Sequence, residues 1–112
     1  MLPKKHRLSK TADVNLTTAK GRSFFSRSFI LKSLNRPDLD IPQIGVIAST
    51  KVSKSAVVRN RLKRVIRQAI HGYIKEIKPG YYIFIVKHAA VAVTSDELRQ
   101  ELEFALKKAK LI

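Results

Sequence analysis

The stretch Lys51-Val-Ser-Lys-Ser-Ala-Val-Val-Arg-Asn-Arg-Leu-Lys-Arg-Val-Ile-Arg67 does most to decide the fold of this chain. Its apolar residues recur at helical spacing and Ser55 is a good N-cap, so a helix is predicted from Ser55 to about Lys75. The stretch also holds seven basic residues and no acidic one. Such a helix can pack one face on a core and present cations to a polyanion on the other.

A helical wheel separates this predicted helix into two faces. With Arg59 set at about 0°, a core-facing stripe spans roughly 240° to 340° and holds Leu62, Val65, Ile66, Ala69 and Tyr73. A cationic ridge spans roughly 0° to 140° and holds Arg59, Asn60, Lys63, Arg64 and Arg67. Arg61 lies apart near about 200°. It could contact a different part of a partner or only the protein's own surface.

The ridge has two interpretations, a solvated helix face or a phosphate-binding surface. A solvated face normally mixes charge signs, because like charges four residues apart destabilise a helix. Here Arg59, Lys63 and Arg67 repeat a positive charge at that spacing with no acid between them. Arginine also presents planar donors that suit phosphate, so the pattern favours phosphate binding. Asn60 could donate to a base, a ribose or a metal-bound water, or could simply be solvated.

Composition supports a nucleic-acid partner for one domain of 112 residues. The net charge is +15 and the isoelectric point about 10.6, which is typical of nucleic-acid-binding domains. The absence of cysteine excludes disulfides and thiolate chemistry. The start of the chain lacks the apolar segment of a signal peptide, and the longest apolar run, Tyr81 to Val86, is too short to cross a membrane. We therefore expect a soluble, cytoplasmic protein with no membrane partner.

The other predicted elements form an α+β pattern. Residues 1–8 are predicted to be a basic, extended arm, because Pro3 disfavours helix. The expected elements are a helix from Ser9 or Thr11 to Lys20 ended by Gly21, one or two strands within Phe24–Leu34, a turn at Asn35–Asp38, a strand at 44–48, a turn at Pro79–Gly80, a strand at Tyr81–Lys87 buried on both faces, and a helix opened by the capping box Thr94–Glu97. We expect these to build a two-layer sandwich of one sheet with packed helices, a single nucleic-acid-binding domain over residues 1–112 with its basic segment at 51–75.

The sequence offers no catalytic site of its own. Phosphodiester hydrolysis needs a metal pair or an acid and base. The carboxylates sit in turns and in the last predicted helix, and His6, His71 and His88 are not at metal-ligand spacing. No nucleophile motif and no glycine-rich phosphate loop is present. We therefore predict no catalytic residue and no metal site in this chain.

The segment Lys51–Gln68 resembles the "RNR" signature of the bacterial ribonuclease P protein family. Here the signature is carried by Lys51, Ala56, Val57, Arg59, Asn60, Arg61, Lys63, Arg64 and Arg67. The resemblance covers the whole chain. Leu2-Pro3, Arg7-Leu8, Asp13 and Gly21 fall around the family's opening helix, and Gly45-Val-Ile-Ala-Ser49 is similar to its strand before the signature.

This resemblance implies both a fold and a function. The fold has the order α-β-β-β-α-β-α, with a left-handed βαβ crossover through the basic helix as in certain ribosomal proteins. The function is that of the protein subunit of ribonuclease P, which joins a catalytic RNA and promotes Mg²⁺-dependent removal of the 5′ leader from precursor tRNA. The RNA would hold the catalytic groups and most of the Mg²⁺, and no protein partner is required. The residues implied to bind the catalytic RNA are Lys51, Lys54, Arg59, Asn60, Arg61, Lys63, Arg64 and Arg67.

The resemblance also implies a cleft for the single-stranded leader between the sheet and the first helix. Our candidates are aromatic and basic, because stacking within a positive groove holds single strands; they are Lys10, Lys20, Arg22, Phe24, Phe25, Arg27, Phe29 and Lys32. The three phenylalanines suit an ordinary core as well, and Phe29 alternates with Leu31. Val14, Thr18 and Lys32 stand where family members often carry aromatic residues. The cleft would then stack bases or bind phosphate, and Lys32 favours phosphate.

Two rival functions belong to other classes. A ribosomal or other structural RNA-binding protein would need the cationic ridge but no leader cleft. A DNA-binding helix-turn-helix protein is disfavoured, because no short helix and tight turn precede the basic helix.

Overall fold

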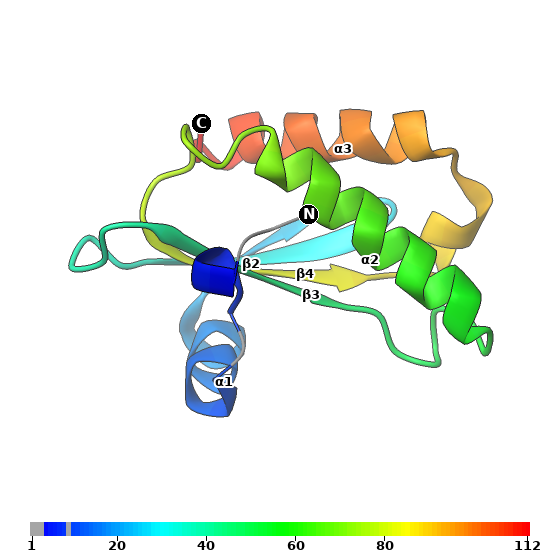
Figure 1. Ribbon diagram of the computed structural model, residues 1–112, viewed down its shortest axis with the longest axis horizontal. Coiled ribbons are helices and arrows are strands. Elements are labelled where there is room, and N and C mark those ends of the chain that lie inside the picture. The colour runs from blue at the N-terminus through cyan, green and yellow to red at the C-terminus, as the bar shows by residue number, and fades with distance from the viewer. Residues whose placement is uncertain (1–3, 9) are drawn as a thin grey trace.

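A four-stranded sheet organises the molecule (Figure 1). The computed structural model describes residues 4–8 and 10–112. The strands are β1 (Arg22–Phe25), β2 (Phe29–Asn35), β3 (Pro42–Ile47) and β4 (Gly80–Val86), in the order β1-β2-β4-β3. β4 pairs antiparallel with β2 and parallel with β3. Its central position explains why nearly all its residues are buried, as the apolar run predicted.

Three α-helices cover the two faces of this sheet. They are α1 (Thr11–Lys20), α2 (Ala56–His71) and α3 (Ser95–Lys108), and the short 3₁₀ helices η1 (Lys4–His6) and η2 (His88–Ala92) complete the described elements. The predicted order α-β-β-β-α-β-α is confirmed. α2 and α3 lie on one face of the sheet and α1 on the other (Figure 1). The α+β sandwich therefore gains a partial third layer from α1, and α2 connects the parallel neighbours β3 and β4. The left hand of that connection stays a prediction of the resemblance.

Each face of the sheet has its own apolar cluster. The larger one lies under α2 and α3 and contains Phe29 and Phe84, whose rings meet edge to face with centroids 5.5 Å apart. The smaller one holds Leu8, Tyr81 and Ile83, with Val14 of α1 packed against it. Phe25 and Ile47 project from the same face and stay exposed, so α1 leaves part of the sheet beside this smaller cluster uncovered.

The N-terminal segment differs from the prediction of an extended arm. Residues 4–6 form η1, and the amide of Leu8 donates to the carbonyl of Ile44 at 2.8 Å. His6 is buried, with Nδ1 2.9 Å from the carbonyl oxygen of Pro42. Burial of Leu8 in the smaller cluster attaches this segment to β3. The rest of the predicted arm, residues 1–3, lies outside the described residues.

The basic helix begins as predicted but ends earlier. The hydroxyl of Ser55 accepts from the amide of Val58 at 3.3 Å, which confirms the N-cap. The helix stops at His71 instead of near Lys75, because Gly72 caps it and the chain turns so that Ile77 enters the main core. The low helix propensity of Gly72 and the burial of Ile77 thus oppose the helical pattern that continues past them.

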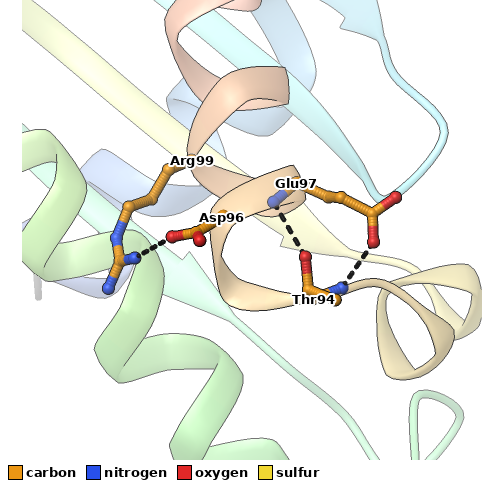
Figure 2. A network of polar contacts seen from close by, with 4 residues as sticks. All are labelled: Thr94, Asp96, Glu97 and Arg99. Atoms are coloured by element: carbon orange, nitrogen blue, oxygen red, sulfur yellow. Dashed lines mark hydrogen bonds and ion pairs between the residues drawn. The ribbon is translucent and has the colours of Figure 1, made fainter.

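The capping box of α3 is confirmed in full (Figure 2). The amide of Glu97 donates to Thr94 Oγ1 at 3.1 Å, and the amide of Thr94 donates to Glu97 Oε1 at 3.0 Å. These reciprocal bonds satisfy two backbone donors at the start of the helix. None of the helices in the described part of the chain is long and apolar enough to span a lipid bilayer.

Candidate RNA-binding surfaces

The outer face of α2 presents the cationic ridge that the helical wheel predicted. Leu62, Val65, Ile66 and Ile70 are buried against the sheet and α3. On the other side, a surface cavity of about 390 Å³ is lined by Asn60, Lys63, Arg64, Arg67 and Gln68. The separation into a core face and a polar face is therefore confirmed. The cavity offers guanidinium, ammonium and amide donors to one ligand.

In the part of the chain that the structure describes, no ion pair with a carboxylate neutralises this ridge. The ion pairs of the described residues join Arg36 to Asp38, Arg99 to Asp96 and Lys107 to Glu103, and none includes a residue of α2. Like charges thus stand one turn apart along α2 without a compensating partner. Such a surface lowers its energy when a polyanion covers it.

Arg59 makes an internal contact that the sequence did not indicate. Its Nη1 donates to the carbonyl oxygen of Ser53 at 2.8 Å, so this guanidinium is partly committed to the loop before α2. His88 supports the same loop, with Nδ1 2.7 Å from the carbonyl oxygen of Val52. The loop carries exposed Lys51 and Lys54. Arg59 and His88 therefore fix the backbone from which these two lysines project.

The remaining signature residues differ in their exposure. Asn60 and Arg64 are exposed, whereas Arg61, Lys63 and Arg67 are half-buried. Val57 is 78% exposed in the first turn of α2. Arg67 reaches the edge strand β3, where it lines a second cavity of about 210 Å³ together with Arg7, Leu8, Val14 and Ile47. Arg67 therefore connects the ridge with the open surface beside α1.

Strand register divides the predicted leader-cleft residues between the two faces. Phe24 pairs with Leu31, which pairs with Phe84, so Phe24 faces the main core and is packed against it. Phe25 belongs to the opposite set, which faces α1, and is 69% exposed. The prediction that Phe29 lines the cleft is wrong, because its side chain is fully buried in the main core. Of the three aromatic candidates, Phe25 alone projects from the α1 face.

The basic cleft candidates are dispersed in the same way. Lys32 lies on the α1 face, where its Nζ donates to Ser23 Oγ at 2.6 Å, and Lys10 precedes α1. Arg22 points to the other face of the sheet, and Arg27 lies in the β1–β2 hairpin beside α3. Lys20 lines a cavity together with Arg22 at the far end of the sheet. The eight candidates therefore do not form one cleft.

The carboxylates that accept hydrogen bonds or form ion pairs have structural roles. Glu101 accepts hydrogen bonds from the hydroxyls of Ser26 and Ser28 and from the amide of Ser28, and so holds the β1–β2 hairpin on α3. The Thr94 amide and hydroxyl hold the pKa of Glu97 below its ordinary value, and Lys107 does the same for the pKa of Glu103. Among residues 4–8 and 10–112, no group of three or more His, Asp or Glu residues could hold a metal ion.

A family model and the sequences of known proteins both relate this chain to ribonuclease P proteins. A family model described as ribonuclease P matches residues 2–110. The ribonuclease P protein component of Bacillus velezensis is 33% identical over 110 residues, which cover 98% of this chain and 94% of that protein.

Solved structures agree with these relatives. The RNase P protein of Staphylococcus aureus superposes with a TM-score of 0.89 at 31% identity, covering 95% of this chain and 96% of that one. The RNase P protein of Thermotoga maritima has a TM-score of 0.78 and covers 91% of this chain and 96% of that one. At 24% identity, this last likeness concerns the fold.

Proposed function

The chain belongs to the family of bacterial ribonuclease P protein components, and on that premise we propose that it binds a catalytic RNA through α2 and promotes removal of the 5′ leader from precursor tRNA. Membership of the family implies association with ribonuclease P RNA. The observation that carries the proposal is the unneutralised ridge of α2 with its cavity lined by Asn60, Lys63, Arg64 and Arg67.

The ridge and the loop before it form the proposed surface for the catalytic RNA. Lys51, Lys54, Lys63, Arg64 and Arg67 would contact phosphates, releasing counterions and making the affinity depend on salt. Asn60 lies among them and can donate to phosphate, ribose or base. Arg59 serves this surface mainly by holding Ser53, and Arg61 contributes at its edge.

The open sheet surface beside α1 is the proposed site for the leader. Exposed Phe25 offers a stacking surface, and Lys32 and Lys10 offer charge. Exposed Ile47 and the cavity that contains Arg67 continue this surface toward α2. A single strand held here would therefore lead directly to the RNA bound at the ridge. With one exposed aromatic among the predicted candidates, we propose that phosphate contacts contribute more than stacking.

We propose that the catalytic groups and the required Mg²⁺ belong to the RNA. Mg²⁺ supplies charge stabilisation and an activated water in phosphodiester hydrolysis. The chain's own contribution is positive charge, which lowers the repulsion between catalytic RNA and substrate and so reduces the Mg²⁺ concentration that assembly requires. We propose that this role needs no other protein partner and that the protein acts in the cytoplasm, where precursor tRNA is processed.

Reconstitution tests the proposal. The chain is combined with a bacterial ribonuclease P RNA at a low Mg²⁺ concentration, at which that RNA alone is inactive, and precursor tRNA cleavage is followed. We expect cleavage at the mature 5′ end to be restored. Unchanged cleavage, in conditions where the Bacillus velezensis component restores it, would refute the proposal. Crosslinking in the native cell that recovers ribosomal RNA instead would favour a structural RNA-binding protein.

A further inference from the structure

A second basic cavity lies at the end of the sheet away from the loop before α2. It has a volume of about 480 Å³. Four cations from different parts of the chain line it, namely Lys20, Arg22, Lys78 and Lys110, together with Ser33, Asn35 and Tyr82. Strand pairing places Asn35 opposite Gly80 at this end, whereas Ile47, which leads to the loop, pairs with Ile85 at the other end. The cavity is therefore separate from both surfaces described above.

The backbones that carry these cations are fixed by hydrogen bonds. The amide of Lys78 donates to the carbonyl of Leu111 at 3.3 Å, and Tyr82 Oη donates to the carbonyl of Lys78 at 2.6 Å. Arg22 is held by its pairing with Ser33. Burial raises the pKa of Tyr82 to about 12, so its hydroxyl stays neutral and keeps this bond at physiological pH. Hydrogen bonds therefore hold the backbone at Lys78 and Arg22, from which these two side chains reach the cavity.

Lys110 occupies a backbone conformation that glycine would adopt at lower cost. Its φ is 60°, the only positive φ of a non-glycine residue among the described residues. The amide of Leu111 donates to the carbonyl of Leu106 and that of Lys110 to the carbonyl of Lys107, which is the Schellman motif that usually has glycine at this place. A lysine here costs the fold stability. The strained position therefore brings a cation to the edge of the cavity at some cost in stability.

The charge of the cavity is not offset from within the protein. No carboxylate lines it, and none of the ion pairs in the described residues includes Lys20, Arg22, Lys78 or Lys110. Arginine and lysine with neighbouring hydroxyl and amide donors match the oxygens of a phosphate. Convergent positive charge of this kind destabilises the free protein and is relieved by a bound anion.

We propose that this cavity binds a backbone phosphate of RNA, as a second anchor remote from the ridge of α2. That the anion belongs to RNA rests on the proposed function; that the cavity binds phosphate does not. The phosphate could come from the catalytic RNA or from precursor tRNA, and the experiments below separate these sources. An RNA that contacts both the ridge and the cavity would span the length of the sheet.

The first experiment uses the free protein and inorganic phosphate. Backbone amide resonances are followed by NMR while phosphate is added at constant ionic strength. We expect saturable shifts at Lys78, Lys110 and Leu111, in addition to any shifts in α2. These shifts should disappear in the double variant Lys78→Gln/Lys110→Gly, whereas shifts in α2 persist. Absence of saturable shifts around the cavity of the unmodified protein would overturn the proposal.

The second experiment measures RNA affinity with a matched control. Lys75→Gln/Lys108→Gln removes the same charge from exposed residues that do not line the cavity. We expect the cavity variant to bind RNA about three- to tenfold more weakly at low salt and to lose about one unit of the salt slope, whereas the control changes little. Lys110→Gly alone should keep or raise the melting temperature, because glycine relieves the strain. Equal losses in the two double variants would overturn RNA binding at the cavity.

Repeating this affinity measurement with different RNAs identifies which RNA supplies the phosphate. A loss with ribonuclease P RNA alone assigns the phosphate to the catalytic RNA. A loss only when the assembled holoenzyme binds precursor tRNA assigns it to the substrate. If the cavity binds inorganic phosphate but the chain does not bind ribonuclease P RNA, the proposed function fails and the phosphate site stands.

Discussion

α2 and α3 lie on the same face of the same sheet but carry opposite kinds of outer surface (Figure 1). Both bury an apolar stripe in the main core, formed by Leu62, Val65, Ile66 and Ile70 in α2 and by Leu98, Leu102, Ala105 and Leu106 in α3. α2 carries five basic residues and no acid, whereas α3 carries four acids and three bases. Two of the ion pairs of the protein lie on α3, and one of them, Arg99 with Asp96, is visible in Figure 2.

This difference separates the requirements of folding from those of binding. The inward faces must be apolar in both helices, because both contribute to one core. The outward faces contribute little to stability, since exposed ion pairs are worth about 0–1 kcal/mol. α3 shows the mixed surface of an ordinary soluble helix. The fold does not require the uniform charge of α2, and we propose that a partner accounts for it.

The largest predicted effect tests whether the two helices contribute equally to the main core. Leu62 of α2 and Leu102 of α3 are both almost completely buried in the main core. Leu62→Ala and Leu102→Ala should each lower the free energy of unfolding by about 2–5 kcal/mol, because both lose apolar contacts and leave a cavity. Urea denaturation measures this. A small effect of either one would show that its helix is not an equal part of the core.

The next prediction tests the difference between their outer faces. Arg64→Ala/Arg67→Ala on α2 should weaken binding to ribonuclease P RNA by about 100-fold at low salt, since each lost charged contact is worth about tenfold. Filter binding over a series of salt concentrations measures affinity and slope together. The matched control is Arg99→Ala/Lys107→Ala on α3, which removes the same charge from ion-paired residues. Equal losses would mean that only net charge matters and that α2 has no special surface.

The same contrast explains which features the sequence could predict. Helix starts, the capping box and the two faces of α2 follow from residues within one or two turns, and these predictions are confirmed. The end of α2 depends on Ile77 packing against distant residues of the core, so the helical pattern alone predicted it too late. Burial of Leu8 against β3 is long-range in the same sense and was also missed.

Surfaces that combine several segments of the chain could be predicted less well from the sequence. Shifting a strand by one residue exchanges its two faces, so only the observed register assigns Phe24 to the core and Phe25 to the α1 side. The cavity with Lys20 and Lys110 brings together residues 90 positions apart. No local pattern in the sequence predicts that these residues meet. The sequence does show a lysine, Lys110, at a place after the last helix where glycine is usual.

A smaller effect is expected within the signature itself. Arg59→Ala should lower the free energy of unfolding by about 1.5 kcal/mol, because the hydrogen bond to Ser53 is lost and its carbonyl loses a charged donor. Arg64→Ala should leave stability unchanged, since Arg64 is exposed. Amide exchange in residues 52–58 should accelerate in the first variant alone. Equal stability of the two variants would show that Arg59 does not stabilise the loop before α2, which would leave RNA binding as its only proposed role.

The smallest effect concerns the N-caps, where α2 and α3 differ in pH dependence. Thr94→Ala and Ser55→Ala should each lower stability by about 1 kcal/mol or less, because each hydroxyl caps one backbone amide. At α3, Glu97 also accepts from the Thr94 amide, and these bonds hold its pKa below the ordinary value of 4.5. Its contribution is therefore complete above pH 4.5 and is lost as the pH falls through the lowered pKa. Val58 stands at the corresponding place in α2 and cannot titrate. Thermal melts of Glu97→Gln and the unmodified protein should accordingly converge as the pH falls below 4.5, whereas the effect of Ser55→Ala should stay constant over the same range.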